Sequence, residues 1–164
     1  MNDQDLDFET LYRRYAADVF RFALYLSGRR DQAEDITAET FVRAWTSSEP
    51  IRSSTVKAYL ITIARNLYRM DQRRHQRQEP MTDDIADSTP GPETSTAVRR
   101  NLERLRAALQ QLPEADRSVL IMRAYDELSY EDIAVAMGMS SGAARVKAHR
   151  ARARHAELLS KEAS

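Results

Sequence analysis

Apolar residues recur at intervals of three and four along most of the chain, which is the spacing of one face of an α-helix. In the first half this spacing predicts three helices, over residues 8–26, 31–45 and 56–67, and the first should end at Gly28. Asp31 and Glu34 resemble a capping box, and Ser53 or Ser54 is expected to cap the third helix. No segment alternates strictly between apolar and polar residues as a half-buried strand does. We therefore expect an all-helical first half.

The second half is predicted to be helical as well. Leucines at helical spacing run through residues 98–112, and Pro113 suits the first turn of the next helix. Two short helices should follow, with Ser129 capping the first, Gly138 at the turn and Ser140 capping the second. Small Ala134 lies where the two helices would cross closely. This spacing is typical of a DNA-binding helix-turn-helix.

Composition separates the two halves. Residues 78–97 hold three of the five prolines and a cluster of Ser and Thr, and from residue 80 they carry four acidic and no basic side chains. Such a segment cannot bury enough apolar surface to order itself, which predicts a flexible acidic linker. Ten of the twelve aromatic residues precede residue 69, so each half is expected to have its own core. The fold predicted is all-α: two small domains, a three-helix one over 1–77 and a four-helix one over 98–160, joined by linker 78–97.

The overall composition excludes several classes of protein. The chain of 164 residues has no Cys and only three scattered His, so disulfides, thiolate metal sites and a three-His metal site are excluded. Four Gly provide no glycine-rich phosphate loop. No apolar run approaches the roughly 20 residues that span a bilayer, and the acidic N-terminus is unlike a signal peptide. We expect a cytoplasmic protein without membrane insertion, catalytic residue, metal, cofactor or small-molecule substrate.

The helix after the predicted turn is basic. No acidic residue occurs from Ile133 through Ala156, and an acid-free positive face is what a helix in the major groove needs. Arg145 is the best candidate to read bases, whereas the serines at the helix start suit phosphate. A solvated basic helix or a helix-packing unit is the alternative. The candidate DNA-binding residues are Ser140, Ser141, Arg145, Lys147, His149, Arg150 and Arg152.

Two further surfaces stand out in the first half. The third helix continues into a basic stretch with interleaved amide and aromatic groups, which suits phosphates and unstacked bases, although cations also favour any helix C-terminus. The polar loop 46–54 before it is either a base pocket or a connector. The second helix is acidic at its start, which suits a basic protein partner or reflects the ordinary preference of helix N-termini. The remaining aromatic residues of both stripes are expected in the core.

Four stretches, in order, resemble bacterial RNA polymerase sigma factors of the extracytoplasmic-function group over nearly the whole chain. Residues 8–15 are similar to that family's opening helix, and Asp31–Trp45 (DQAEDITAETFVRAW) to its core-binding helix. Residues 58–67 with 71–74 resemble the −10 recognition helix. Residues 112–114, 128–134 and 149–152 resemble the −35 domain.

The resemblance implies a factor that binds core polymerase and directs promoter recognition, melting and initiation, with no chemistry of its own. The second helix would dock on the clamp helices of the largest polymerase subunit, through Asp31, Glu34, Asp35, Glu39, Phe41 and Trp45. The loop 46–54 and third helix would capture the unwound −10 strand, through Lys57, Arg65, Asn66, Arg69, Arg73 and Arg74. The helix-turn-helix would read the −35 duplex. The linker would thread the polymerase's RNA path, where its charge would imitate RNA.

Other partners implied are the flap of the second-largest subunit and an anti-sigma factor, which would hold the protein at the membrane. The recognition helix departs from the family: it reads Gly142–Ala148 (GAARVKA), where Thr-Val more often follows the Gly and a Leu stands near Ala148. That leaves the −35 sequence open. Two other classes fit the residues less well: a free-standing helix-turn-helix regulator acting without polymerase, and a helical adaptor that binds only protein.

Overall fold

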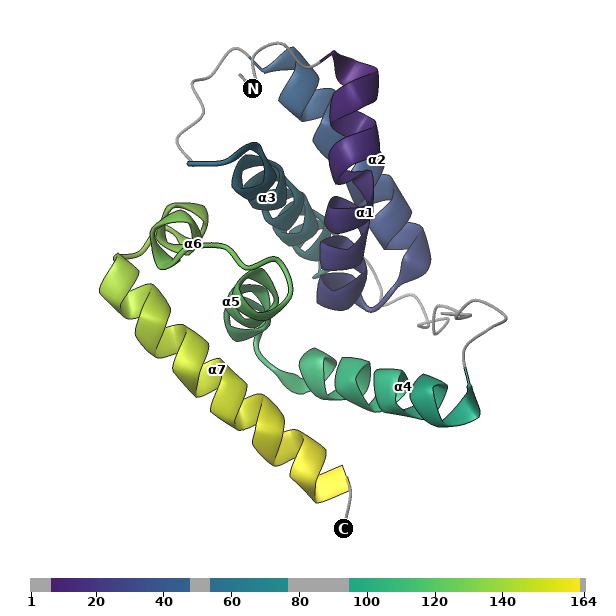
Figure 1. Cartoon of the computed structure of the whole chain (residues 1–164), viewed down its shortest axis with the longest axis vertical. Helices are drawn as coiled ribbons and strands as arrows, with labels where there is room; N and C mark the ends of the chain where they lie inside the picture. The colour runs from purple at the N-terminus through teal and green to yellow at the C-terminus, as the bar shows by residue number, and fades with distance from the viewer. Residues whose placement is uncertain (1–6, 48–53, 77–94, 163–164) are drawn as a thin grey trace.

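The computed structural model describes residues 7–47, 54–76 and 95–162 (Figure 1). Within these ranges the chain forms seven helices and no strand, as the all-α prediction required. Loop residues 48–53, which include Ser53, lie outside the described residues, and so do residues 78–94 of the predicted linker. The helices are α1 Phe8–Ser27, α2 Arg30–Thr46, α3 Val56–Gln76, α4 Thr96–Gln111, α5 Glu114–Ala124, α6 Tyr130–Met137 and α7 Ser141–Glu162.

Local chemistry sets most helix ends where the sequence predicts them. Gly28 ends α1 and Gly138 ends α6, with left-handed φ angles of 71° and 66° that favour glycine. The Ser129 hydroxyl accepts a hydrogen bond from the backbone N–H of Asp132 at 3.1 Å. The Ser140 hydroxyl accepts one from the N–H of Ala143 at 3.1 Å. Both elements of the predicted helix-turn-helix are therefore confirmed, with their caps.

Other boundaries differ from the prediction. Helix α2 begins at Arg30 after Arg29, which makes no side-chain cap, so the capping box at Asp31 is wrong. Thr55, not a serine, caps α3 by accepting from the N–H of Ala58 at 3.1 Å. Pro113 occupies the N-cap of α5 rather than its first turn. Helix α4 starts at Thr96, two residues inside the segment assigned to the linker.

The helices form an N-terminal module (α1–α3) and a C-terminal module (α4–α7), which pack against each other. Figure 1 shows α5 and α6 beside α1 and α3, and the contacts confirm that α5 packs on α1 and α6 on α3. Buried apolar side chains of both modules belong to one cluster, including Phe22 and Ile61 of the first and Ile121 and Ile133 of the second. The expectation of two separate cores is therefore wrong.

Candidate protein-binding and nucleic-acid surfaces

The outer face of α2 is acidic at its start and apolar at its end. Asp31, Glu34, Asp35 and Glu39 are all exposed, because the opposite face of the helix packs on α1 and α3. Val42 continues the face at 50% exposure. The side chains of Glu39 and Arg43 pair at 3.1 Å. A helix face that combines carboxylates with uncovered apolar groups is suited to a protein partner bearing cations.

The aromatic residues at the far end of this face are less buried than the sequence suggested. Trp45 is 53% exposed, Phe8 40% and Tyr12 44%, although Phe8 packs edge-on to Trp45 and stacks on Tyr12. The expectation that Phe8 and Tyr12 lie in the core is wrong. Phe41, by contrast, is 1% exposed and packs edge-on to Tyr12. Phe41 is thus a core residue that supports the face, and the prediction that it contacts a partner does not hold in this fold.

The predicted −10 residues are divided among three sides of α3. Asn66, Arg69 and Arg73 are exposed at spacings of three and four, so they share one outward face. Arg74 is also exposed, but it lines a groove between α2 and α3 with Asp35 and Glu39. Lys57 is half-buried, and Arg65 is buried. The structure therefore brings three of the six residues together and separates the others.

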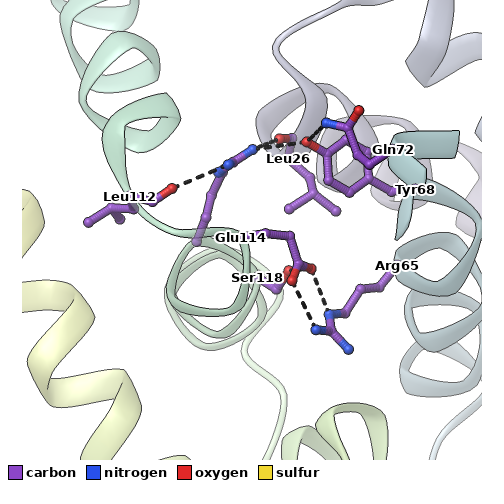
Figure 2. Close-up of polar contacts among 8 residues, drawn as sticks. Leu26, Arg65, Tyr68, Gln72, Leu112, Glu114 and Ser118 are labelled. Atoms are coloured by element: carbon purple, nitrogen blue, oxygen red, sulfur yellow. Dashed lines mark hydrogen bonds and ion pairs between the residues drawn. The ribbon is translucent and has the colours of Figure 1, made fainter. Parts of the chain in front are cut away.

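Arg65 lies at the interface between the modules rather than on a free surface. Its guanidinium donates to both carboxylate oxygens of Glu114 on α5, with distances of 2.9 Å and 3.1 Å (Figure 2). The Ser118 hydroxyl donates to the same carboxylate at 2.8 Å. Arg65 is 5% exposed in this arrangement. It cannot contact DNA until α5 moves away.

Arg117 joins the modules beside this ion pair. It is 8% exposed and donates to the carbonyls of Leu26 and Leu112, which lie at the C-terminal ends of α1 and α4 (Figure 2). It also donates to the Tyr68 hydroxyl at 3.3 Å. Helix C-termini carry partial negative charge, so a cation is favourable there. Gln110 adds a hydrogen bond at 2.9 Å to the carbonyl of Tyr25.

The interface extends to the helix-turn-helix. Asp132 of α6 accepts hydrogen bonds from the backbone N–H of Ser54 at 2.9 Å and from its hydroxyl at 2.5 Å. Asp132 is 5% exposed, so water competes little for this contact. Sequence analysis missed Glu114, Arg117 and Asp132, because each pairs with residues far away in the chain. These residues stand out only in the folded structure, where their charged side chains are largely covered.

A buried carboxyl lies at the same boundary. The Asp126 side chain is fully buried and pairs with Arg21 of α1 at 3.3 Å. Burial raises the pKa of Asp126 to about 6, against the opposing influence of Arg21 and of Lys57, while Asp18 adds to the rise. One of its oxygens, Oδ2, has no hydrogen-bond partner. The folded protein thus keeps this carboxyl group protonated up to about pH 6.

This pKa predicts a pH dependence of stability. An aspartate in an unfolded chain titrates near 4, so the folded state holds the proton more tightly between about pH 4 and pH 6. The contribution of Asp126 to stability is therefore fully present below pH 4 and is lost as the pH rises through 6. Relative to Asp126→Asn, the wild type should lose on the order of 2 kcal/mol across that range. Chemical denaturation at several pH values checks this, with exposed Glu131→Gln as control; parallel curves for wild type and Asp126→Asn would contradict it.

The predicted −35 residues cluster at the start of α7. Ala144, Ala148 and Ala151 are buried against α5 and α6, whereas Ser140, Ser141, Arg145, His149, Arg150 and Arg152 are exposed. Lys147 is half-buried and pairs with Asp116 at 2.8 Å. The Arg145 guanidinium lies 4.6 Å from the centre of the Tyr130 ring. From Ser141 to Ala156, α7 thus carries basic side chains and no acidic one, and some of these basic side chains are held in place by contacts within the module.

Two family models match the chain, and they divide it where the modules divide. Sigma-70 region 2 matches residues 11–78, and sigma-70 region 4 matches residues 102–154. The ECF RNA polymerase sigma factor EcfG of Rhodopseudomonas palustris is 34% identical, over 84% of this chain and 77% of the relative. The chain belongs to the extracytoplasmic-function sigma factor family. As a sigma factor, it binds core RNA polymerase and directs promoter recognition in transcription initiation.

Further comparisons agree with this assignment. The ECF sigma factor SigE of Mycolicibacterium smegmatis is 34% identical over 95% of this sigma factor, which spans only 63% of that relative's length. The solved structure of the sigma factor RpoE from Bartonella quintana, in complex with the anti-sigma factor NepR, matches with a TM-score of 0.78 and 29% identity. That match covers 94% of this chain and 97% of the other.

The described residues contain neither a helix long and apolar enough to cross a bilayer nor a group of three or more His, Asp or Glu side chains arranged to hold a metal ion. The described parts of the sigma factor present three surfaces: an acidic and apolar face on α2, a basic face on α3 and a basic face on α7.

Proposed function

We propose that the three surfaces divide the work of a sigma factor among them. The outer face of α2 docks on the clamp helices of the polymerase, the outward face of α3 holds the unwound −10 strand, and α7 reads the −35 duplex. The assigned domains are residues 1–77 and 98–160, with 78–97 as the linker along the RNA path. The observation that carries the proposal is a difference in charge among the three surfaces: exposed carboxylates outnumber exposed cations on α2, whereas exposed cations outnumber carboxylates on the C-terminal half of α3 and on α7.

The docking surface on α2 consists of residues that the fold leaves uncovered. Asp31, Glu34, Asp35 and Glu39 supply charge, which steers association with a basic partner. Val42 and Trp45 supply uncovered apolar area, which supplies affinity when a partner covers it. The flap of the second-largest subunit would take the C-terminal module.

The nucleic-acid surfaces differ in the form of DNA that they suit. Asn66, Arg69 and Arg73 present donors along one side of α3, where a single strand can follow them. Arg65 and Lys57 join that surface only when the C-terminal module withdraws. On α7 the helix start follows a turn of helix-turn-helix geometry, which places such a helix in the major groove.

The packed arrangement of the modules is a resting form that opens during promoter recognition. With Arg65 bound to Glu114 and Ser54 bound to Asp132, part of the −10 surface is covered by the −35 module. A fully extended linker of about 18 residues reaches roughly 60 Å. This length is enough for the two modules to reach separate promoter elements once the contacts between the modules break. Polymerase binding would supply the free energy for opening.

An anti-sigma factor is a further proposed partner of this cytoplasmic protein. The structurally similar RpoE is bound by NepR, and it matches this chain over both modules at once. An anti-sigma factor that favours the packed arrangement would hold the −10 surface covered, and one anchored in a membrane would hold the protein there.

Paired substitutions test the assignment of the two DNA surfaces. In the holoenzyme, Arg69→Ala with Arg73→Ala should weaken strand opening at least about tenfold while protection of the −35 duplex persists. Arg145→Ala with Arg150→Ala should instead reduce promoter recruitment by a similar factor. Permanganate reactivity of thymines reports opening, and footprinting reports recruitment. Arg13→Ala, an exposed arginine on α1 paired with Glu9, is the control; unchanged opening and recruitment in both pairs would overturn the assignment.

A further inference from the structure

The outward face of α7 has an apolar side chain at its centre. Val146 is 48% exposed in the middle of the basic stretch. Ala144, Ala148 and Ala151 are buried and mark the inner side of the helix. At 100° per residue, Val146 points away from that side. About half of this β-branched apolar side chain is therefore left uncovered by its own module.

The surroundings of Val146 combine small and apolar residues with charged ones. A groove at this place is lined by Val146 together with Met139, Gly142, Ala143, Asp116, Lys147 and Arg150. A Cβ built on Gly142 would meet nothing within 4 Å, so the surface there is open. The helix can therefore approach a partner closely along this strip.

The neighbouring cations are drawn to the two sides of the strip. Lys147 is held by Asp116 at 2.8 Å on the α5 side. Arg145 lies over the Tyr130 ring at 4.6 Å on the α6 side, and Arg123 lies over the same ring at 4.2 Å. Cation–π contact restrains a guanidinium of this kind. Between Arg145 and Lys147 the outward face of α7 presents Val146, with the exposed His149 and Arg150 one turn further along.

Among base edges in the major groove, thymine alone presents a methyl group. We propose that Val146 contacts the C5-methyl of a thymine in the −35 element and selects for that base at one position. This inference rests on the proposed function of α7 as the −35 reader. It names a specificity residue that charge and spacing did not identify.

DNA fits this strip better than an apolar protein surface does. Basic side chains flank Val146 on both sides, and no acidic residue occurs from Ile133 through Ala156. Phosphates on either side of a major groove complement such a rim. Ser141 and the first backbone N–H groups of α7 lie at the N-terminal end of the helix, where anions such as phosphates are favoured.

Removal of a single methyl group from the DNA tests the contact. Holoenzyme made with the full chain first enriches −35 sequences from a randomised promoter library. Each enriched thymine is then replaced by deoxyuridine, which keeps base pairing and lacks only the methyl. Wild type should lose about three- to fivefold in affinity at one position. Val146→Ala should lose nothing there. Val98→Ala, on α4 with a similar exposure of 49%, should behave as wild type.

Each outcome decides one claim. Insensitivity of the wild type to every deoxyuridine, or equal sensitivity of Val146→Ala, overturns the thymine contact while the −35 assignment stands. If Val146→Ala binds polymerase more weakly but keeps its sensitivity to the methyl group, the strip is a protein-binding surface. This result also overturns the thymine contact. Absence of any enriched −35 sequence overturns the proposed function of α7 itself. Ala has a higher helix propensity than Val, so the variant should fold.

Discussion

Reversing Asp35 and Glu39 together, to arginine, is expected to lower the affinity for core RNA polymerase at least about a hundredfold. Both side chains are exposed on the outer face of α2, so the variant should fold with little change in melting temperature. Like charges brought together across an interface cost several kcal/mol, which is the source of the expected loss. Gel filtration or fluorescence anisotropy with labelled sigma factor measures assembly directly.

A matched control separates this effect from net charge. Glu103→Arg with Glu131→Arg changes the charge by the same amount on exposed positions of the C-terminal module. This control should assemble like wild type. Normal assembly by the Asp35 and Glu39 variant would show that α2 is not the docking face. Equal loss in both variants would attribute the effect to overall charge.

Replacing Glu114 by lysine is expected to open the two modules. The substitution removes the partner of Arg65 and places a second cation beside it. Disruption of a largely buried ion pair costs about 3 kcal/mol or more, which lowers the ratio of closed to open protein on the order of a hundredfold. The radius of gyration from small-angle scattering should rise. Because the chain has no cysteine, dyes on cysteines introduced at exposed Arg14 and Ala156 report the same change.

Opening should also expose the −10 surface. The free Glu114→Lys variant is expected to bind single-stranded DNA more tightly than wild type, since Arg65 becomes accessible. Glu131→Lys is the control: Glu131 lies on the neighbouring helix α6, is exposed, and carries the same charge change without contacting Arg65. A closed Glu114→Lys protein with unchanged DNA binding would show that the ion pair neither holds the modules together nor covers the surface.

The sequence predicted the helices and the helix-turn-helix well because these depend on local chemistry. Gly28 and Gly138 end helices at positive φ, and Ser129 and Ser140 cap them with hydroxyls, all within a few residues. The capping box at Asp31 failed although its spacing fitted. The helix begins at Arg30, one residue before Asp31, so Asp31 lies inside the first turn and cannot act as the N-cap.

Burial was predicted less well, because it depends on which faces meet. Phe41 and Trp45 are four residues apart on the same helix, yet the first is buried and the second is exposed near its end. Arg65 belongs to a basic stretch that favours DNA by composition, and its burial follows only from a glutamate 49 residues away. The packing of the modules likewise depends on long-range pairs such as Ser54 with Asp132. The DNA- and polymerase-contacting roles assigned to individual residues remain predictions.

Run-off transcription tests the central claim most directly. Purified core polymerase is incubated with fragmented genomic DNA from the source organism, with wild type, with the Asp35 and Glu39 charge-reversal variant, or with neither. New discrete transcription starts that appear with wild type and vanish with the variant are the predicted result. Folded wild-type protein that yields no new start and no stable complex with core polymerase would contradict the account.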